Sequence, residues 1–187
     1  MEWAFFECKN LILNTASNPD FSQLTSLDSM FRGASAFQGC SIGNWDVSTV
    51  TDMTAMFYGA THFNGNISNW DVSSVKYMGR MFQDTYDFNQ NIGGWNVSQV
   101  IEMYSMFQGM EFLNQNLNSW NVGTVENMWQ MFTDALSFDG NITSWNVSKV
   151  TTMYRMFCGA IACRQNLSGW DVSSVIDHTD FSVNSEV

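Results

Sequence analysis

The sequence predicts a repeat solenoid in which short parallel strands alternate with short helical or 3₁₀ turns, over about six coils of 25 residues plus a cap at each end. Two observations predict this fold class. Tryptophan returns at a fixed spacing of 25 residues, and the residues around each tryptophan return with it. A fixed period of about 20 to 50 residues is typical of solenoids, because stacked coils bury an apolar face that one coil cannot bury alone. The tryptophans of this column are Trp45, Trp70, Trp95, Trp120, Trp145 and Trp170.

The coils share the frame Ile/Leu-x-x-Trp-Asp/Asn-Val-Ser-x-Val-x-x-Met-x-x-Met-Phe with few replacements, and apolar residues occupy its fixed slots. We assign the Val, Met and Phe slots to the core. The spacing of three within Val-x-x-Met-x-x-Met-Phe predicts a short helix or 3₁₀ turn. Glycine follows the Met-Phe pair at 33, 59, 109 and 159, as it does at many helix ends. The segment Ile-x-x-Trp-x-Val has period two and aromatic or β-branched residues, which favours a strand.

The repeat divides the chain into three parts. Residues 1–20 are expected to form an N-terminal cap, residues 21–171 the six-coil solenoid, and residues 172–187 a partial seventh coil that acts as the C-terminal cap. The frame departs from its rule near both ends: one extra residue lies within 38–41, and His178 replaces a methionine. Solenoid ends need atypical sequence, because a bare apolar end would associate with other chains.

The run Asn-Trp-Asp-Val-Ser-Thr-Val-Thr-Asp-Met at 44–53, with its repetition in later coils, resembles the BspA-like leucine-rich-repeat surface proteins. It is more closely similar to the 25-to-26-residue Trp-Asp-Val-Ser repeat of bacterial surface lipoproteins. The resemblance covers about 150 of the 187 residues. It implies a leucine-rich-repeat-like solenoid at a cell surface or outside the cell, used for adhesion or protein binding, with no enzymatic activity. It defines no functional residues for this chain.

Composition and charge exclude several classes of partner. The net charge is −11, from 18 acidic and 7 basic side chains. Such a surface repels nucleic acid phosphates and anionic lipid headgroups. No run of about 18 apolar residues occurs, so we expect no membrane insertion by this segment. We therefore expect a protein partner, with a glycan as the second candidate and a structural subunit of a larger assembly as the third.

The tryptophan column has two interpretations. A row of exposed aromatic rings could stack on sugar rings, as in carbohydrate-binding modules. Alternatively, each tryptophan fills the core or its edge and donates its indole N–H to a backbone carbonyl. We favour the second interpretation, because core columns flank the tryptophans and none of the six is replaced. Burial of Trp70, Trp95 and Trp120 would distinguish the two.

A column of asparagines immediately precedes the Ile/Leu slot. In leucine-rich repeats an inward asparagine satisfies backbone groups of its own turn and of the adjacent coil, and we expect the same structural role here. The members of this column are Asn66, Asn91, Asn116, Asn141 and Asn166.

The four cysteines lie only near the ends of the repeat, Cys8 and Cys40 at one end and Cys158 and Cys163 at the other. An even number concentrated at the ends predicts disulfides that fix the caps, and hence an oxidising compartment. We predict a bridge between Cys8 and Cys40 in particular, because Cys40 lies in the only insertion of the repeat. Four free thiols are the alternative, since Cys163 falls in a core column.

Residues with catalytic or metal-binding chemistry are sparse. The chain has two histidines, His62 and His178, and no Ser-His-Asp, Cys-His or His-x-x-x-His arrangement can be built from them. We therefore expect no catalytic, metal-binding or cofactor-binding residues, and a non-catalytic protein.

Overall fold

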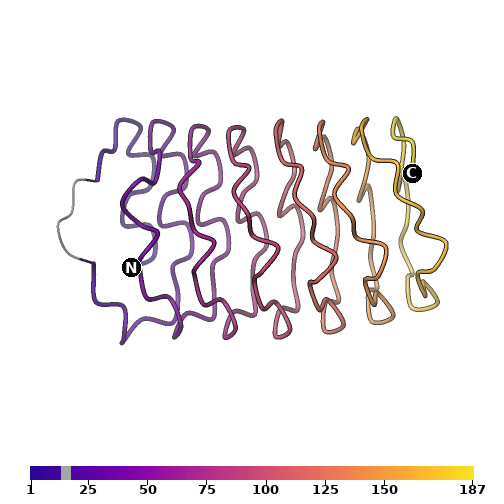
Figure 1. Ribbon diagram of the computed structural model, residues 1–187, viewed down its shortest axis with the longest axis horizontal. Coiled ribbons are helices and arrows are strands. Elements are labelled where there is room, and N and C mark those ends of the chain that lie inside the picture. The colour runs from indigo at the N-terminus through magenta and orange to yellow at the C-terminus, as the bar shows by residue number, and fades with distance from the viewer. Residues whose placement is uncertain (14–17) are drawn as a thin grey trace.

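The computed structural model describes residues 1–13 and 18–187. The chain winds into a stack of similar coils along one axis, with the N-terminus among the coils at one end and the C-terminus in the coil at the other end (Figure 1). Isolated parallel bridges link consecutive coils, and they join residues 25 or 26 positions apart. The bridging residues are Ser26, Asp52, Tyr77, Glu102, Asn127, Thr152 and Asp177.

The predicted fold class is wrong in its elements. Across 1–13 and 18–187 the structure has no helix and no strand, and the coils consist of turns joined by the isolated bridges. The strands and helical turns of a leucine-rich-repeat solenoid are therefore absent from the described residues. These residues also include no helix that is long and apolar enough to cross a membrane.

The hydrogen bonds of the Val-x-x-Met-x-x-Met-Phe segment explain why it is not a strand. The N–H groups of Met53, Ala55 and Phe57 each donate to a carbonyl of the next coil at 2.9 Å. The intervening N–H groups turn back on their own chain: Met56 donates to Met53 at 3.2 Å, and Tyr58 donates to Ala55 at 3.1 Å. A strand directs its N–H groups to neighbouring strands, so a segment that closes a turn at every second residue cannot form a sheet.

Two left-handed residues in each coil explain why the same segment is not a helix. Ala55 has a φ of 52° and Gly59 a φ of 68°, and the equivalent residues of the other coils also have positive φ. A right-handed helix cannot continue through a left-handed residue. From Gly59 onward the second of these positions alternates between glycine and Asp or Asn. The Asp84 carboxylate lies against Gly109, where an added Cβ would collide with it.

The Ile-x-x-Trp-x-Val segment also forms turns instead of the predicted strand. The N–H of Trp70 donates to the carbonyl of Ile67 at 3.1 Å, and the N–H of Val75 donates to the carbonyl of Val72 at 3.0 Å. Both bonds span three residues, so the segment forms one turn, and a second turn starts at its last residue, Val72. Ile67, Trp70, Val72 and Val75 nevertheless all point into the core and are at most 3% exposed.

The apolar slots of successive coils form one continuous core. The ring of Phe82 stacks between those of Phe57 and Phe107, with centroid distances of 5.7 Å and 6.1 Å. The rings of Trp95 and Trp120 are stacked in the same way, with centroids 6.4 Å apart and planes within 4°. Each coil is therefore held to its neighbours by a backbone ladder and by stacked side chains.

The two ends of the chain follow the same plan. Trp3, Phe5 and Glu7 donate their N–H groups to carbonyls of the next coil at 2.7–3.1 Å, so residues within 1–13 form a coil segment. The predicted N-terminal cap also includes residues 14–17, which lie outside the described residues. In the last coil Val172 is 50% exposed, whereas its equivalents in the preceding coils are at most 1% exposed.

Candidate binding surface

The six tryptophans of the repeat lie in the core and are 3–8% exposed. The indole N–H of Trp95 donates to the carbonyl of Ile67 at 3.2 Å, and Trp70, Trp120, Trp145 and Trp170 each bond in the same way to the carbonyl 28 residues earlier. Neighbouring rings from Trp95 to Trp170 stack nearly parallel. A sugar needs an exposed ring face to stack on. The column offers none, so the carbohydrate alternative loses the feature that suggested it.

The predicted asparagine column lies on the surface and does not point inward. The Oδ1 atom of each asparagine accepts the backbone N–H two residues further on, at 3.0–3.1 Å. This geometry is an Asx turn, in which the side chain closes its own turn. The expected inward orientation is therefore corrected for Asn66, Asn91, Asn116, Asn141 and Asn166.

A different asparagine column links the coils. The Oδ1 atom of Asn64 accepts the N–H of Asn89 at 3.3 Å, that of Asn89 accepts the N–H of Asn114 at 3.1 Å, and that of Asn114 accepts the N–H of Asp139 at 3.0 Å. The side-chain amide of Gln115 adds a 2.6 Å bond to Asn89. The 25-residue period marks this column too, but the period alone does not tell which asparagine reaches the next coil.

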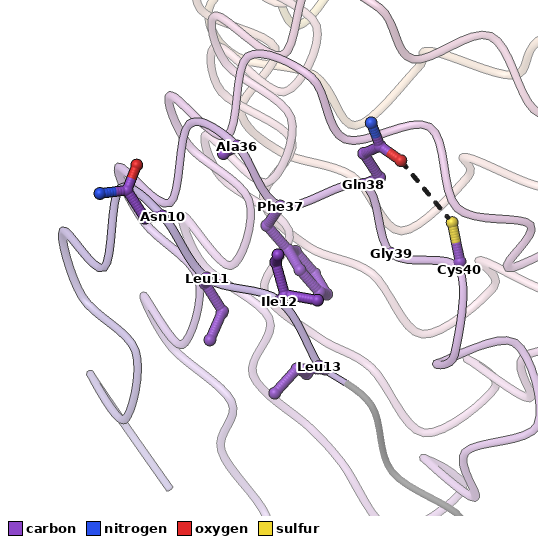
Figure 2. A pocket seen from close by; sticks show the side chains of 9 residues that line it. All are labelled: Asn10, Leu11, Ile12, Leu13, Ala36, Phe37, Gln38, Gly39 and Cys40. Atoms are coloured by element: carbon purple, nitrogen blue, oxygen red, sulfur yellow. Dashed lines mark hydrogen bonds between the residues drawn. The ribbon is translucent and has the colours of Figure 1, made fainter.

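All four cysteines are free thiols, so the predicted disulfides and the disulfide between Cys8 and Cys40 are wrong. The register of the coils explains the first pair. Cys8 follows Glu7, which lies against Gly33 of the next coil, whereas Cys40 lies seven positions beyond Gly33. The Cys40 thiol is instead 4.0 Å from the Oε1 atom of Gln38 (Figure 2). A disulfide needs the two Cα atoms within about 7 Å. Cys8 and Cys40 lie at different positions of their coils, so they do not meet this requirement.

Cys158 and Cys163 lie in different environments. Cys163 occupies the phenylalanine column and is fully buried, whereas Cys158 lies on the outer surface and is half-buried. The two side chains therefore point to different sides of the chain. Burial raises the pKa of the Cys163 thiol to about 11.

We expect the four thiols to react with iodoacetamide in a fixed order at neutral pH. The exposed Cys8 and Cys40 should react first, Cys158 more slowly, and Cys163 only after unfolding. Cys163 is inaccessible, and its raised pKa keeps it in the unreactive thiol form well above neutral pH. Timed alkylation followed by peptide mass spectrometry measures the order. Rapid labelling of Cys163 in the folded chain would contradict this assignment.

A hollow of about 370 Å³ lies where residues 10–13 pass residues 36–40 (Figure 2). Leu11, Ile12 and Phe37 give it an apolar lining, and Asn10 and Gln38 lie at its polar part. The hollow coincides with the insertion in the first coil. Its described lining includes no Asp, Glu, His, Lys or Arg side chain, and Cys40 is the titratable group within that lining.

Three partly buried aromatic residues form a second row, on the outer surface. The ring centroid of Trp129 is 6.5 Å from that of Tyr104 and 6.1 Å from that of Tyr154. The guanidinium groups of Arg80 and Arg155 lie 5.7 Å and 5.3 Å from the centroids of Tyr104 and Tyr154. Trp129 therefore stacks on Tyr154 and is tilted by 42° against Tyr104, and an arginine lies over each tyrosine. This arrangement strengthens the surface but leaves little free ring face for a ligand.

A strip of exposed apolar side chains crosses four consecutive coils. Tyr86 is 39% exposed, Phe112 54%, Leu136 41% and Ile161 57%. Tyr86, Leu136 and Ile161 occupy the same position of their coils, two residues after the second left-handed residue, and Phe112 lies one position further on, next to Glu111. We call these four residues the edge strip. Single exposed apolar residues are ordinary, whereas exposed apolar residues repeated on neighbouring coils make a candidate interaction surface.

Carboxylates accompany the edge strip. Asp84 and Asp134 precede Tyr86 and Leu136 by two residues, and Glu111 is adjacent to Phe112. In the described part of the chain, no lysine, arginine or histidine forms an ion pair with Asp84, Glu111 or Asp134. Burial, together with the Asp134 carboxylate, raises the pKa of Asp84.

Two ionisable nitrogen groups near the edge strip already have acidic partners. The Nδ1 atom of His62 is 2.8 Å from Asp87, and the Nε atom of Arg164 is 2.6 Å from Glu186. The free charge beside the strip is therefore negative. Among residues 1–13 and 18–187, no three His, Cys, Asp or Glu side chains come together as a metal site.

The comparisons with known proteins give one match. The model of the family described as "Mycoplasma protein of unknown function, DUF285" matches residues 1–116 and residues 90–186. No curated protein and no solved structure matches the chain. The predicted membership of the BspA-like leucine-rich-repeat family is therefore wrong. The two matches together span almost the entire sequence, and the chain belongs to the DUF285 family.

Proposed function

We propose that the chain is a non-catalytic binding module that presents a rigid repeat surface to a protein partner. The edge strip is the observation that carries this proposal. It exposes Tyr86, Phe112, Leu136 and Ile161 on four neighbouring coils, whereas the core columns of the same coils bury their apolar side chains. An apolar row of this kind gains free energy when a partner removes it from water.

The core beneath the edge strip supports the proposal, because it fixes the strip in place before a partner arrives. Phe88, Leu113 and Phe138 lie one to two residues beyond strip positions and are completely buried. The backbone ladder crosses each coil junction a few residues earlier. A preorganised surface loses little conformational entropy on binding, so more of the contact energy appears as affinity.

A non-catalytic role is supported by the positions of the two histidines. His62 lies in the second bridged coil, paired with Asp87, and His178 lies in the last coil. They cannot act together in one site. A location at the cell surface or outside the cell stays a prediction of the sequence. Because the cysteines are free, they no longer support this location by indicating an oxidising compartment.

Two isoleucines provide a matched test of the proposal. Ile161 belongs to the edge strip and is 57% exposed, whereas Ile176 lies outside the strip and is 87% exposed. The immobilised chain and its Ile161→Ser and Ile176→Ser variants are incubated with the same cell extract, and the retained proteins are quantified by mass spectrometry. We expect at least one protein whose recovery falls about tenfold with Ile161→Ser and is unchanged with Ile176→Ser. Equal retention by all three chains would exclude the edge strip as the binding surface.

A further inference from the structure

We infer that the partner offers the edge strip an extended segment in which lysine or arginine alternates with apolar side chains. This inference rests on the proposed function and adds the chemistry of the partner. It follows from two features that lie side by side on the surface, the exposed apolar row and the carboxylates without ionic partners.

The length of the strip limits the size of the segment. Four coils are separated by three steps, and neighbouring backbones in such a ladder lie about 4.8 Å apart, so the strip is about 15 Å long. An extended chain covers about 3.3 Å per residue, so about five residues span the strip. Successive side chains of an extended segment point to opposite sides. Every second side chain of the partner can therefore contact the edge strip, while the side chains between them point away or reach the carboxylates beside the strip.

The carboxylates beside the edge strip determine that the remaining side chains of the partner segment are basic. Glu111 lies within the row of strip positions, and the Asp134 carboxylate rests against Gly159, which has no side chain to cover it. Neither carboxylate has an ion-pair partner among the residues that the structure describes. A lysine or arginine of the partner would supply one, whereas an acidic segment would be repelled by these groups and by the net charge of −11.

Asp134 can be neutralised with little change in shape. The equivalent position of the last coil is Asn184, which adopts the same left-handed conformation, with φ 60° beside 55° for Asp134. Asp134→Asn therefore removes the charge without requiring a new backbone conformation. Glu111 is exposed, so Glu111→Gln also leaves the core untouched.

The experiment measures binding of three synthetic hexapeptides by fluorescence anisotropy at fixed ionic strength. One alternates lysine with leucine, one alternates glutamate with leucine, and one alternates lysine with glycine. The tested chains are the wild type, Ile161→Ser, the double variant Glu111→Gln/Asp134→Asn, and a control double variant, Glu2→Gln/Glu126→Gln. The control removes the same charge from exposed positions outside the strip.

We expect the lysine–leucine peptide to bind most tightly. Glu111→Gln/Asp134→Asn should weaken its affinity about five- to tenfold, the control variant less than about twofold, and Ile161→Ser should weaken it as well. Equal losses in the two double variants would show attraction by net charge alone and would overturn the inference. Preference for the glutamate–leucine peptide, or no binding of any peptide, would also overturn it. The extract experiment with Ile161→Ser and Ile176→Ser tests the proposed function separately, so the two can fail independently.

Discussion

Replacing Trp95 with alanine should lower the free energy of unfolding by about 3–5 kcal/mol. The indole is 4% exposed and lies between stacked aromatic rings, with centroids 6.2 Å from Phe82 and 6.4 Å from Trp120. Alanine would leave a cavity in the middle of the stack, where neighbours on both sides are fixed by their own coils. The core therefore cannot collapse fully into the space, and most of the packing energy is lost.

The lost hydrogen bond adds less to this effect than the lost volume. The carbonyl of Ile67 accepts the indole N–H of Trp95 at 3.2 Å, but it also accepts the backbone N–H of Trp70 at 3.1 Å. After the substitution this carbonyl keeps one partner, so it does not become an unsatisfied buried group. Trp95→Phe should accordingly be much less destabilising than Trp95→Ala, because it restores most of the ring.

Urea unfolding followed by circular dichroism measures these differences. Trp3→Ala is the matched control, since Trp3 is 47% exposed and its removal should cost less than about 1 kcal/mol. If Trp95→Ala were no more destabilising than Trp3→Ala, the tryptophan column would contribute little to the core.

The sequence predicts which residues are buried far better than it predicts the path of the backbone. Met78, Met81 and Phe82 are fully buried, as expected of slots repeated in every coil. Their spacing of three and one also suits a helix, which is why the sequence predicts a helical turn here. The left-handed residue between them is Arg80, with φ 57°. Arginine is not typical of that conformation, so nothing at this position indicates a series of turns.

The repeat period likewise predicts only part of the candidate binding surface. Tyr86, Glu111 and Leu136 are equivalent positions in three coils, and this variation is typical of residues that point outward. The period does not single out Phe112, which is 54% exposed although it lies one position beyond the others. Nor does it show that Asp84 and Asp134 lie beside this row without ionic partners, because such contacts depend on how the corner of the coil is folded.

Deleting one whole period should leave a folded chain, whereas deleting half a period should not. Removal of residues 97–121 joins Asn96 to Val122, which follows the equivalent Asn121 in the next coil. Every column then stays in register, and the ladder that joins Arg80 to Tyr104 can form between Arg80 and Trp129. Because each coil contacts only its neighbours, the shortened chain should unfold cooperatively, with a denaturant m value reduced in proportion to its length.

Removal of residues 97–108 takes away less of the chain but should be far more damaging. It deletes the ladder donors Met103, Ser105 and Phe107. It also leaves Met110 and Leu113, both fully buried in the intact chain, with Gly109 as the last remaining donor of the adjacent ladder segment. Those side chains would be exposed to water, so we expect loss of cooperative unfolding or aggregation. Similar unfolding curves for the two deletions would contradict a core built from registered columns.

The whole-period deletion also affects the edge strip in a defined way. It removes Phe112 and Glu111 and brings Tyr86 next to Leu136, so three of the four apolar residues remain in a row. Affinity for the lysine–leucine peptide should therefore fall without disappearing, because the shorter row buries less apolar surface and offers one carboxylate fewer. Circular dichroism should keep the shape of the wild-type spectrum. Unchanged affinity in this folded variant would place the binding site elsewhere on the stack.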